Sequence, residues 1–144
     1  MRRVDASQLL PAAPQRVFDF VSDLANLPSW QSGIVSAELT SSPPVGIGST
    51  AHVVRELMGQ QIAVDVTITA YEPGRRLGLS SAASGIGIEA TLELEPASAG
   101  TLARFSMEVR AQSVFMKAVE GMVAGAAASD IATSLERLRT ALVA

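Results

Sequence analysis

Three side chains in the segment TAHVVREL could take part in acid–base or anion chemistry: His52, Arg55 and Glu56. Histidine titrates near neutral pH and a carboxylate accepts protons, so His52 and Glu56 could act as a general acid or base. The Arg55 guanidinium could instead bind a carboxylate or an enolate oxygen of a ligand. These three residues are therefore the catalytic candidates.

Alternation along this segment assigns the candidates to opposite faces of a strand. Arg55 shares a face with Val53 and Leu57, which is the more apolar set, while His52 and Glu56 share the other. We therefore expect Arg55 to point inward and the other two to point outward. A slip of one residue would exchange them. An inward arginine needs an acidic partner or a ligand anion, unless its stem extends to water.

Other kinds of chemistry have little support. A single histidine, the absence of cysteine and the lack of an acidic cluster argue against a metal site. No serine lies in a GxSxG turn, and the GxG of GIGIEA lacks the third glycine of a dinucleotide-binding loop. We therefore expect no metal and no cofactor.

The elements that must position these residues follow from hydrophobic periodicity. Alternating apolar and polar residues, separated by short turns, predict seven strands: Val4–Leu10, IVSAELT, TAHVVREL, QIAVDVTITAY, RRLGLSSAAS, IGIEATLELEP and TLARFSMEVRA. The turns that join them include Met58-Gly59-Gln60, EPG and ASAG. Because such tight turns join antiparallel neighbours, the sheet should be antiparallel.

Helical spacing occurs in two places. In PAAPQRVFDFVSDLAN, the residues Val17, Phe20, Val21 and Leu24 form one apolar face, and a second short helix or turn follows around Leu27 and Trp30. From Ser113 to the end of the sequence a long helix is predicted. The order of strand, two short helices, six strands and a long helix predicts an α+β domain over residues 1–144.

The centre of the long helix has an unusual composition. The stretch GMVAGAAAS, residues 121–129, carries small residues where a core-forming helix usually carries large ones. Each glycine costs about 1 kcal/mol relative to alanine in a helix interior. Two interpretations remain open: a cavity beneath the helix, or close packing of the helix on the sheet.

Composition limits the classes of partner. The chain has 144 residues, a net charge of -3, 48% hydrophobic residues and 17% charged residues. A nucleic-acid-binding surface needs clustered Lys and Arg, so nucleic acid is not an expected partner. No apolar run has the length of a signal peptide or a membrane span, and we expect a cytoplasmic protein.

Three strings, in this order and spacing, resemble the Bet v 1-like/START-like (SRPBCC) superfamily. They are PAAPQRVFDFVSDLANLPSW, PPVGIGSTAHVVRELMGQQIAVDVTITAYEPGRRL and the terminal SLERLRTAL. The sequence is most similar to the polyketide cyclase/dehydrase and lipid-transport group. The resemblance implies a helix-grip fold, in which a curved seven-stranded antiparallel sheet wraps around the C-terminal helix and leaves a cavity. It therefore favours a cavity beneath the small residues of GMVAGAAAS over close packing. Members include cyclases, hydrolases, lipid carriers and hormone sensors, so the resemblance implies no single activity.

The main hypothesis is a domain that binds a small, mainly hydrophobic ligand, lipid- or polyketide-like, as a monomer or homodimer. The alternatives are a polyketide cyclase/dehydrase-type enzyme and an accessory protein-interaction module whose cavity has collapsed. The residues expected to line the cavity are Trp30, Val53, Arg55, Leu57, Val66, Ile68, Leu79, Ser81, Ala90, Leu92, Phe105, Met107, Phe115, Met116, Val119, Met122 and Val123.

Overall fold

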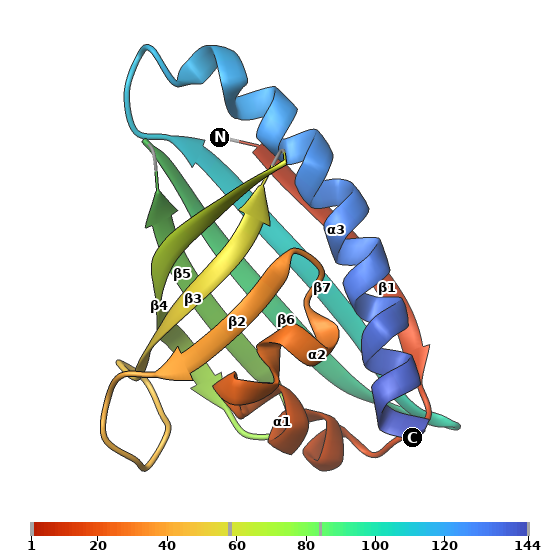
Figure 1. Ribbon diagram of the computed structural model, residues 1–144. Coiled ribbons are helices and arrows are strands. Elements are labelled where there is room, and N and C mark those ends of the chain that lie inside the picture. Colours follow the sequence, from red (N-terminus) through yellow and green to blue (C-terminus); the bar gives the residue numbers. More distant parts are fainter. Residues whose placement is uncertain (1, 58, 84, 144) are drawn as a thin grey trace.

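The computed structural model describes residues 2–57, 59–83 and 85–143 and has the predicted α+β order (Figure 1). The strands are β1 (Arg2–Leu10), β2 (Ile34–Leu39), β3 (Thr50–Leu57), β4 (Gln60–Glu72), β5 (Arg76–Ala83), β6 (Ile86–Ala97) and β7 (Gly100–Ala111). The helices are α1 (Pro14–Ser22), the 3-10 turn η1 (Leu24–Asn26), α2 (Leu27–Trp30) and α3 (Lys117–Val143). The predicted turn at Met58 includes a residue outside this description.

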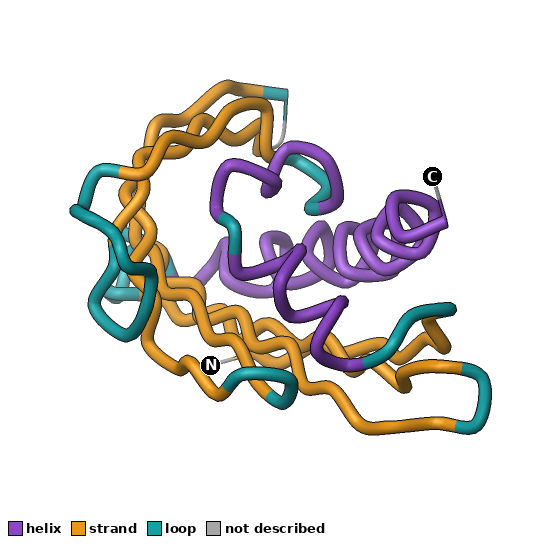
Figure 2. Tube along the Cα trace, turned by 90° about the horizontal axis from the view of Figure 1, so that it is seen from below, coloured by secondary structure: helices purple, strands orange, loops and turns teal. Residues whose placement is uncertain are grey.

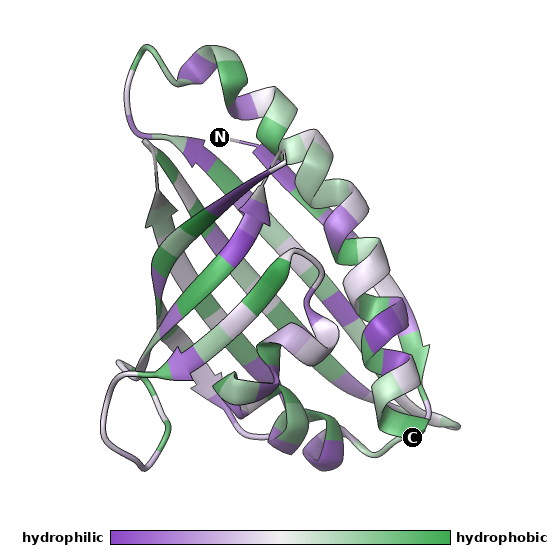
Figure 3. Ribbon diagram, viewed as in Figure 1, coloured by the Kyte–Doolittle hydropathy of each residue, from purple (hydrophilic) through white to green (hydrophobic). Residues whose placement is uncertain are grey.

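All seven strands belong to one antiparallel sheet in the order β1-β7-β6-β5-β4-β3-β2. The first strand therefore pairs with the last, with Arg2 opposite Val109. The sheet is a curved band that partly encloses the helices (Figure 2). Hydrophobic and hydrophilic residues alternate along the strands (Figure 3), as expected when one face of a sheet is buried. The predicted helix-grip fold is confirmed.

The core is concentrated where the C-terminal half of α3 meets the sheet. The helix contacts mainly β1, β7 and α2, and its residues Ile131, Leu135, Leu138 and Leu142 are buried. The first helix adds its own apolar face, although Phe18 rather than the expected Phe20 is its fully buried aromatic residue. The ring of Phe18 lies edge-on to Tyr71, with centroids 5.1 Å apart.

Hydrogen bonds fasten α2 and the residues after it to α3. The Ser134 hydroxyl accepts a hydrogen bond from the Ser32 backbone N–H at 2.8 Å and donates to the Asp130 carbonyl at 2.6 Å. One turn further on, Arg137 Nη2 donates to the Pro28 carbonyl at 2.7 Å. These contacts hold α2 in a fixed place on the concave side of the sheet.

The small residues at the centre of α3 are better explained by close packing than by a cavity. Ala124 and Ala127 are buried, and a Cβ placed on Gly121 would lie 3.3 Å from the Arg2 guanidinium. Gly125 lies on the exposed side of the helix, where an added Cβ would meet nothing within 4 Å. A cavity beneath the helix therefore does not account for Gly125.

The replacement Gly125→Ala should stabilise the protein by up to about 1 kcal/mol, because it removes backbone freedom from the unfolded chain without a clash. Gly121→Ala is the matched variant and should give a smaller gain, because its methyl group meets the Arg2 side chain. Urea denaturation of the three proteins measures the difference. A loss of stability on Gly125→Ala would show that the helix needs flexibility at this point.

Candidate functional site

A small cavity lies on the concave side of the sheet, between α2 and the strands β2 to β6. Its volume is about 20 Å³, which is room for about one water molecule. The lining is mostly apolar, with one charged group and a few polar ones. It consists of Leu27, Gln31, Ile34, Val53, Arg55, Val66, Leu79, Ser80, Ser81, Ile88 and Ala90.

Arg55 points inward, as the alternation in TAHVVREL predicts. It lies between Ile34 of β2 and Ile62 of β4 in the sheet, and it is only 8% exposed. Its Nε atom is buried and has no hydrogen-bond partner. Burial lowers the pKa of Arg55 from its ordinary value, while the nearby Asp130 carboxylate opposes that shift.

The charge of Asp130 on α3 acts on Arg55. Among the described residues, however, Asp130 and Arg55 do not form an ion pair. Its Oδ1 accepts a hydrogen bond of 3.4 Å from the Ser32 hydroxyl. Gly33 lies beside both groups: a Cβ there would be 3.6 Å from Asp130 Oδ2 and 3.9 Å from Arg55 Nη2. Its φ of 91° favours glycine, so this gap stays free of a side chain.

Gln31 is the functional candidate that the sequence analysis missed. It follows α2, lines the cavity and is only 3% exposed, yet its Oε1 has no hydrogen-bond partner. Periodicity gives no orientation for a residue after a four-residue helix. Ser134 had a usable signal, because it shares a helical face with the apolar residues Ile131 and Leu138.

Most of the residues expected to line a cavity are buried, but fewer than half of them reach this one. Val53, Arg55, Val66, Leu79, Ser81 and Ala90 line it, whereas Trp30, Ile68, Leu92, Phe105, Met107 and Val123 are buried elsewhere in the core. Trp30 packs on Phe105 with ring centroids 5.5 Å apart, and its Nε1 has no hydrogen-bond partner. Met116 and Val119 are half-buried against the core. The side chain of Leu57 lies outside the described part.

Two expected ligand-facing residues point outward instead. Phe115 is 92% exposed because α3 begins at Lys117, so Phe115 belongs to the connection from β7 rather than to the predicted helix. Met122 is 58% exposed because α3 rests on β1 and β7 along one face only. Met122 is rotated about 100° from the buried Val123, which takes it off that face. The expectation that these two residues face inward was wrong.

His52 and Glu56 lie on the outer face of the sheet, as predicted. His52 Nδ1 is 3.1 Å from Asp65 Oδ1, and the pair borders a surface hollow together with Glu38, Thr40 and Thr50. Glu56 is exposed as well. Neither side chain can reach a ligand on the concave side, because the sheet separates the outer face from that side.

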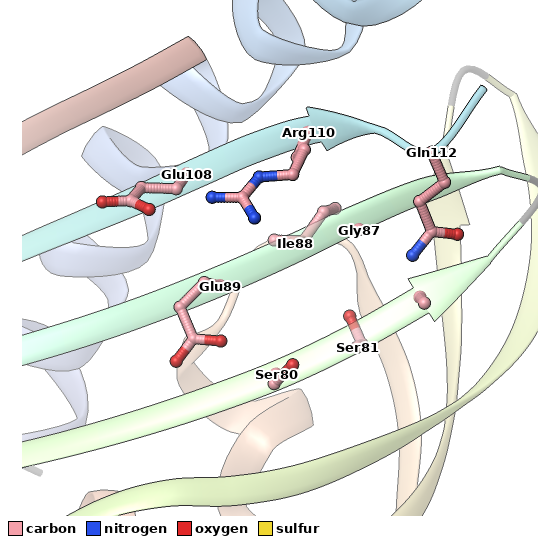
Figure 4. Close-up of a pocket in the computed structure, with 9 residues that line it drawn as sticks. Ser80, Ser81, Gly87, Ile88, Glu89, Glu108, Arg110 and Gln112 are labelled. Carbon is pink, nitrogen blue, oxygen red and sulfur yellow. The ribbon is translucent and has the colours of Figure 1, made fainter. Parts of the chain in front are cut away.

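A larger hollow of about 280 Å³ lies over β5, β6 and β7 (Figure 4). Its lining includes Ser80, Glu89, Glu108, Arg110 and Gln112, which are polar or charged. Glu89 also accepts a hydrogen bond of 2.7 Å from the Thr69 hydroxyl. Ala82, Gly87 and Ile88 add apolar surface, so the lining of this hollow is mixed.

The described ranges lack two further kinds of feature. Residues 2–57, 59–83 and 85–143 contain no group of three or more His, Asp or Glu side chains placed to hold a metal ion. Within the same ranges, no helix combines the length and the apolar character that a membrane span requires.

The pH dependence of stability should reveal the environment of Asp130. Burial raises the pKa of this carboxyl above its ordinary value of 3.8, and the Arg55 and Ser32 neighbours only partly offset it. The folded state therefore binds the proton more tightly than the unfolded state, and stability from this group is lost as pH rises through the raised pKa. The stability of Asp130→Asn relative to the unmodified protein should therefore increase as pH rises above 4. A relative decrease, measured by urea denaturation across this range, would contradict the raised pKa.

Known proteins share this architecture at low sequence identity. A protein from Thermus thermophilus is 19% identical with a TM-score of 0.79, over 96% of this chain and 95% of that one. A START superfamily protein from Mycobacterium smegmatis is 15% identical with a TM-score of 0.78, over 97% and 98%. The XoxI protein from Bacillus cereus is 15% identical with a TM-score of 0.75, over 99% and 96%.

No curated protein matches the sequence. A family profile, described as polyketide cyclase/dehydrase and lipid transport, matches residues 1–143. The match extends over the first strand, the whole sheet and the long helix, and it agrees with the START-like architecture. The chain belongs to the polyketide cyclase/dehydrase and lipid transport family.

Proposed function

We propose that the protein binds a small, mainly hydrophobic molecule, lipid- or polyketide-like, on the concave side of the sheet. The observation that carries the proposal is that α3 covers β1 and β7 and leaves the concave face of β3 to β6 largely to other elements. That face is apolar and includes Val53, Val66, Leu79 and Ala90 around the cavity. An apolar wall with a few polar groups is typical of ligand pockets.

Binding requires this cavity to expand. Its volume of about 20 Å³ is far below the roughly 300–1,000 Å³ of ordinary ligand pockets. The half-buried Ile88 of β6 lines the cavity, and Ile62 of β4 and Val119 of α3 are further half-buried apolar side chains at the edge of the core. Such side chains can change rotamer without breaking the core around Leu135 and Leu138.

The small volume also favours the second candidate, an accessory interaction module with a collapsed cavity. An enzyme of the cyclase type is less well supported, because the described cavity lining has Arg55 but neither a histidine nor a carboxylate. Native mass spectrometry before and after organic extraction separates the first two functions. A retained mass that extraction removes supports ligand binding, whereas an unliganded mass in both samples supports the module.

Filling the cavity should abolish binding. Ala90→Leu places extra volume in the cavity, whereas Ala63→Leu adds the same volume on the exposed outer face of β4. We expect the first variant to lose binding of the neutral apolar dye N-phenyl-1-naphthylamine and the second to retain it, measured by dye fluorescence. Thermal unfolding checks that both fold, and Ser81→Leu replaces Ala90→Leu if the latter does not. Equal dye binding by the two leucine variants would place the site elsewhere.

A further inference from the structure

Two residues that line the cavity carry buried polar atoms without a hydrogen-bond partner. Arg55 Nε and Gln31 Oε1 are both buried and without partners, and both residues line the cavity. Buried polar groups in folded proteins are almost always hydrogen-bonded, and an unpaired buried charge is more costly than a neutral group. Two such groups in the lining of one cavity indicate a missing partner.

The protein does not supply that partner from its own acidic side chains. Among the described residues, Asp130 is the acidic group whose charge raises the pKa of Arg55, yet it forms no ion pair with it, and its Oδ1 accepts a hydrogen bond of 3.4 Å from the Ser32 hydroxyl. No hydrogen bond joins Arg55 to another described residue in the lining of the cavity. We propose that Arg55 and Gln31 bind the carboxylate of an amphiphilic ligand whose apolar body lies along the wall formed by β3 to β6.

A singly charged carboxylate suits this site better than a phosphate. Arg55 is the only cation among the described residues that line the cavity, and a phosphate would bring a second negative charge into an apolar space without compensation. The planar guanidinium matches the two oxygens of a carboxylate. Because Gln31 Oε1 is an acceptor like the carboxylate itself, the amide must turn so that its NH2 group donates to the ligand, and the orientation of an amide follows its partners. Ser81 also lines the cavity, on the same face of β5 as the buried Leu79.

The polar groups are held in place before any ligand arrives. Gln31 is fixed at its backbone, where its N–H donates to the Leu27 carbonyl at 2.9 Å. The next residue, Ser32, is fastened to Ser134 of α3. Arg55 is fixed by the ladder between β2 and β4. A ligand carboxylate would therefore need to order only the two side chains and not the backbone that carries them, which favours binding.

This inference rests on the proposed function, and one experiment separates the two. Decanoate and decan-1-ol have the same apolar chain, and at pH 7 only decanoate carries a charge. Each competes with N-phenyl-1-naphthylamine for the protein, and the fluorescence of the dye reports displacement. We expect decanoate to displace the dye at a concentration about 10-fold lower than decan-1-ol, as one charge-assisted hydrogen bond allows.

The variants assign that preference to the arginine. Arg55→Met should remove the preference for decanoate while decan-1-ol still binds, and Arg55→Lys should retain part of it. Arg104→Met is the matched control, because Arg104 is exposed on the other face of β7 and its loss should change neither affinity. If Arg55→Met does not fold, the comparison uses the lysine variant and Arg55→Gln.

Each outcome has one meaning. Equal displacement by decanoate and decan-1-ol, or an undiminished preference for decanoate in Arg55→Met, overturns the carboxylate site and leaves hydrophobic binding intact. Failure of the dye and of both ligands to bind the unmodified protein overturns the proposed function and the carboxylate site together. A preference that is lost with Arg55 and kept with Arg104→Met establishes the site.

Discussion

The packing of the C-terminal half of α3 against the sheet and α2 is the contact on which the remaining structure depends. The residues Ile131, Leu135 and Leu138 are almost fully buried there, and each such side chain contributes about 1.5–3 kcal/mol by leaving water. The same stretch of helix supplies Ser134 and Arg137, which hold α2 and the residues after it. The C-terminal half of α3 therefore stabilises the core and also positions α2, which forms one wall of the cavity.

The two halves of α3 differ in burial: the C-terminal half stabilises the core, and the N-terminal half is more exposed. Beyond Ile131 the helix is committed to the core. Toward Lys117 it becomes less buried, with Val119 half-buried and Met122 exposed. Exposed or half-buried segments open locally at lower free energy than the core, so the N-terminal part of α3 should open more readily than its C-terminal half.

The fold was predictable because its signals are local and repeated. The segment TAHVVREL has the same bounds as β3, and its alternation assigned Arg55 and His52 to the correct faces. Alternation depends only on the geometry of a strand, so it survives any tertiary arrangement. The order of elements and the resemblance to a known superfamily then predicted that the sheet is curved and that it packs on the C-terminal helix.

The site was less predictable because its geometry depends on distant contacts. Phe115 looked like part of a helix, but where α3 starts is decided by how the chain leaves β7. Gln31 has no periodic neighbours, and its burial results from the position of α2 under α3. The volume of the cavity depends on how many side chains pack together, so it could not be predicted from the glycines of GMVAGAAAS alone. Gly125 faces open space instead.

The pairing of β1 with β7 has a consequence for the order of events during synthesis. The neighbour of Arg2 in the sheet is Val109, so β1 leaves the ribosome long before its partner exists. The strands β2 to β7 can form successive hairpins as they emerge, but β1 must wait for the last of them. Such distant pairings slow folding and leave a strand edge unprotected in the meantime. The nascent chain is therefore most vulnerable to aggregation through its N-terminal strand until the last hairpin is complete.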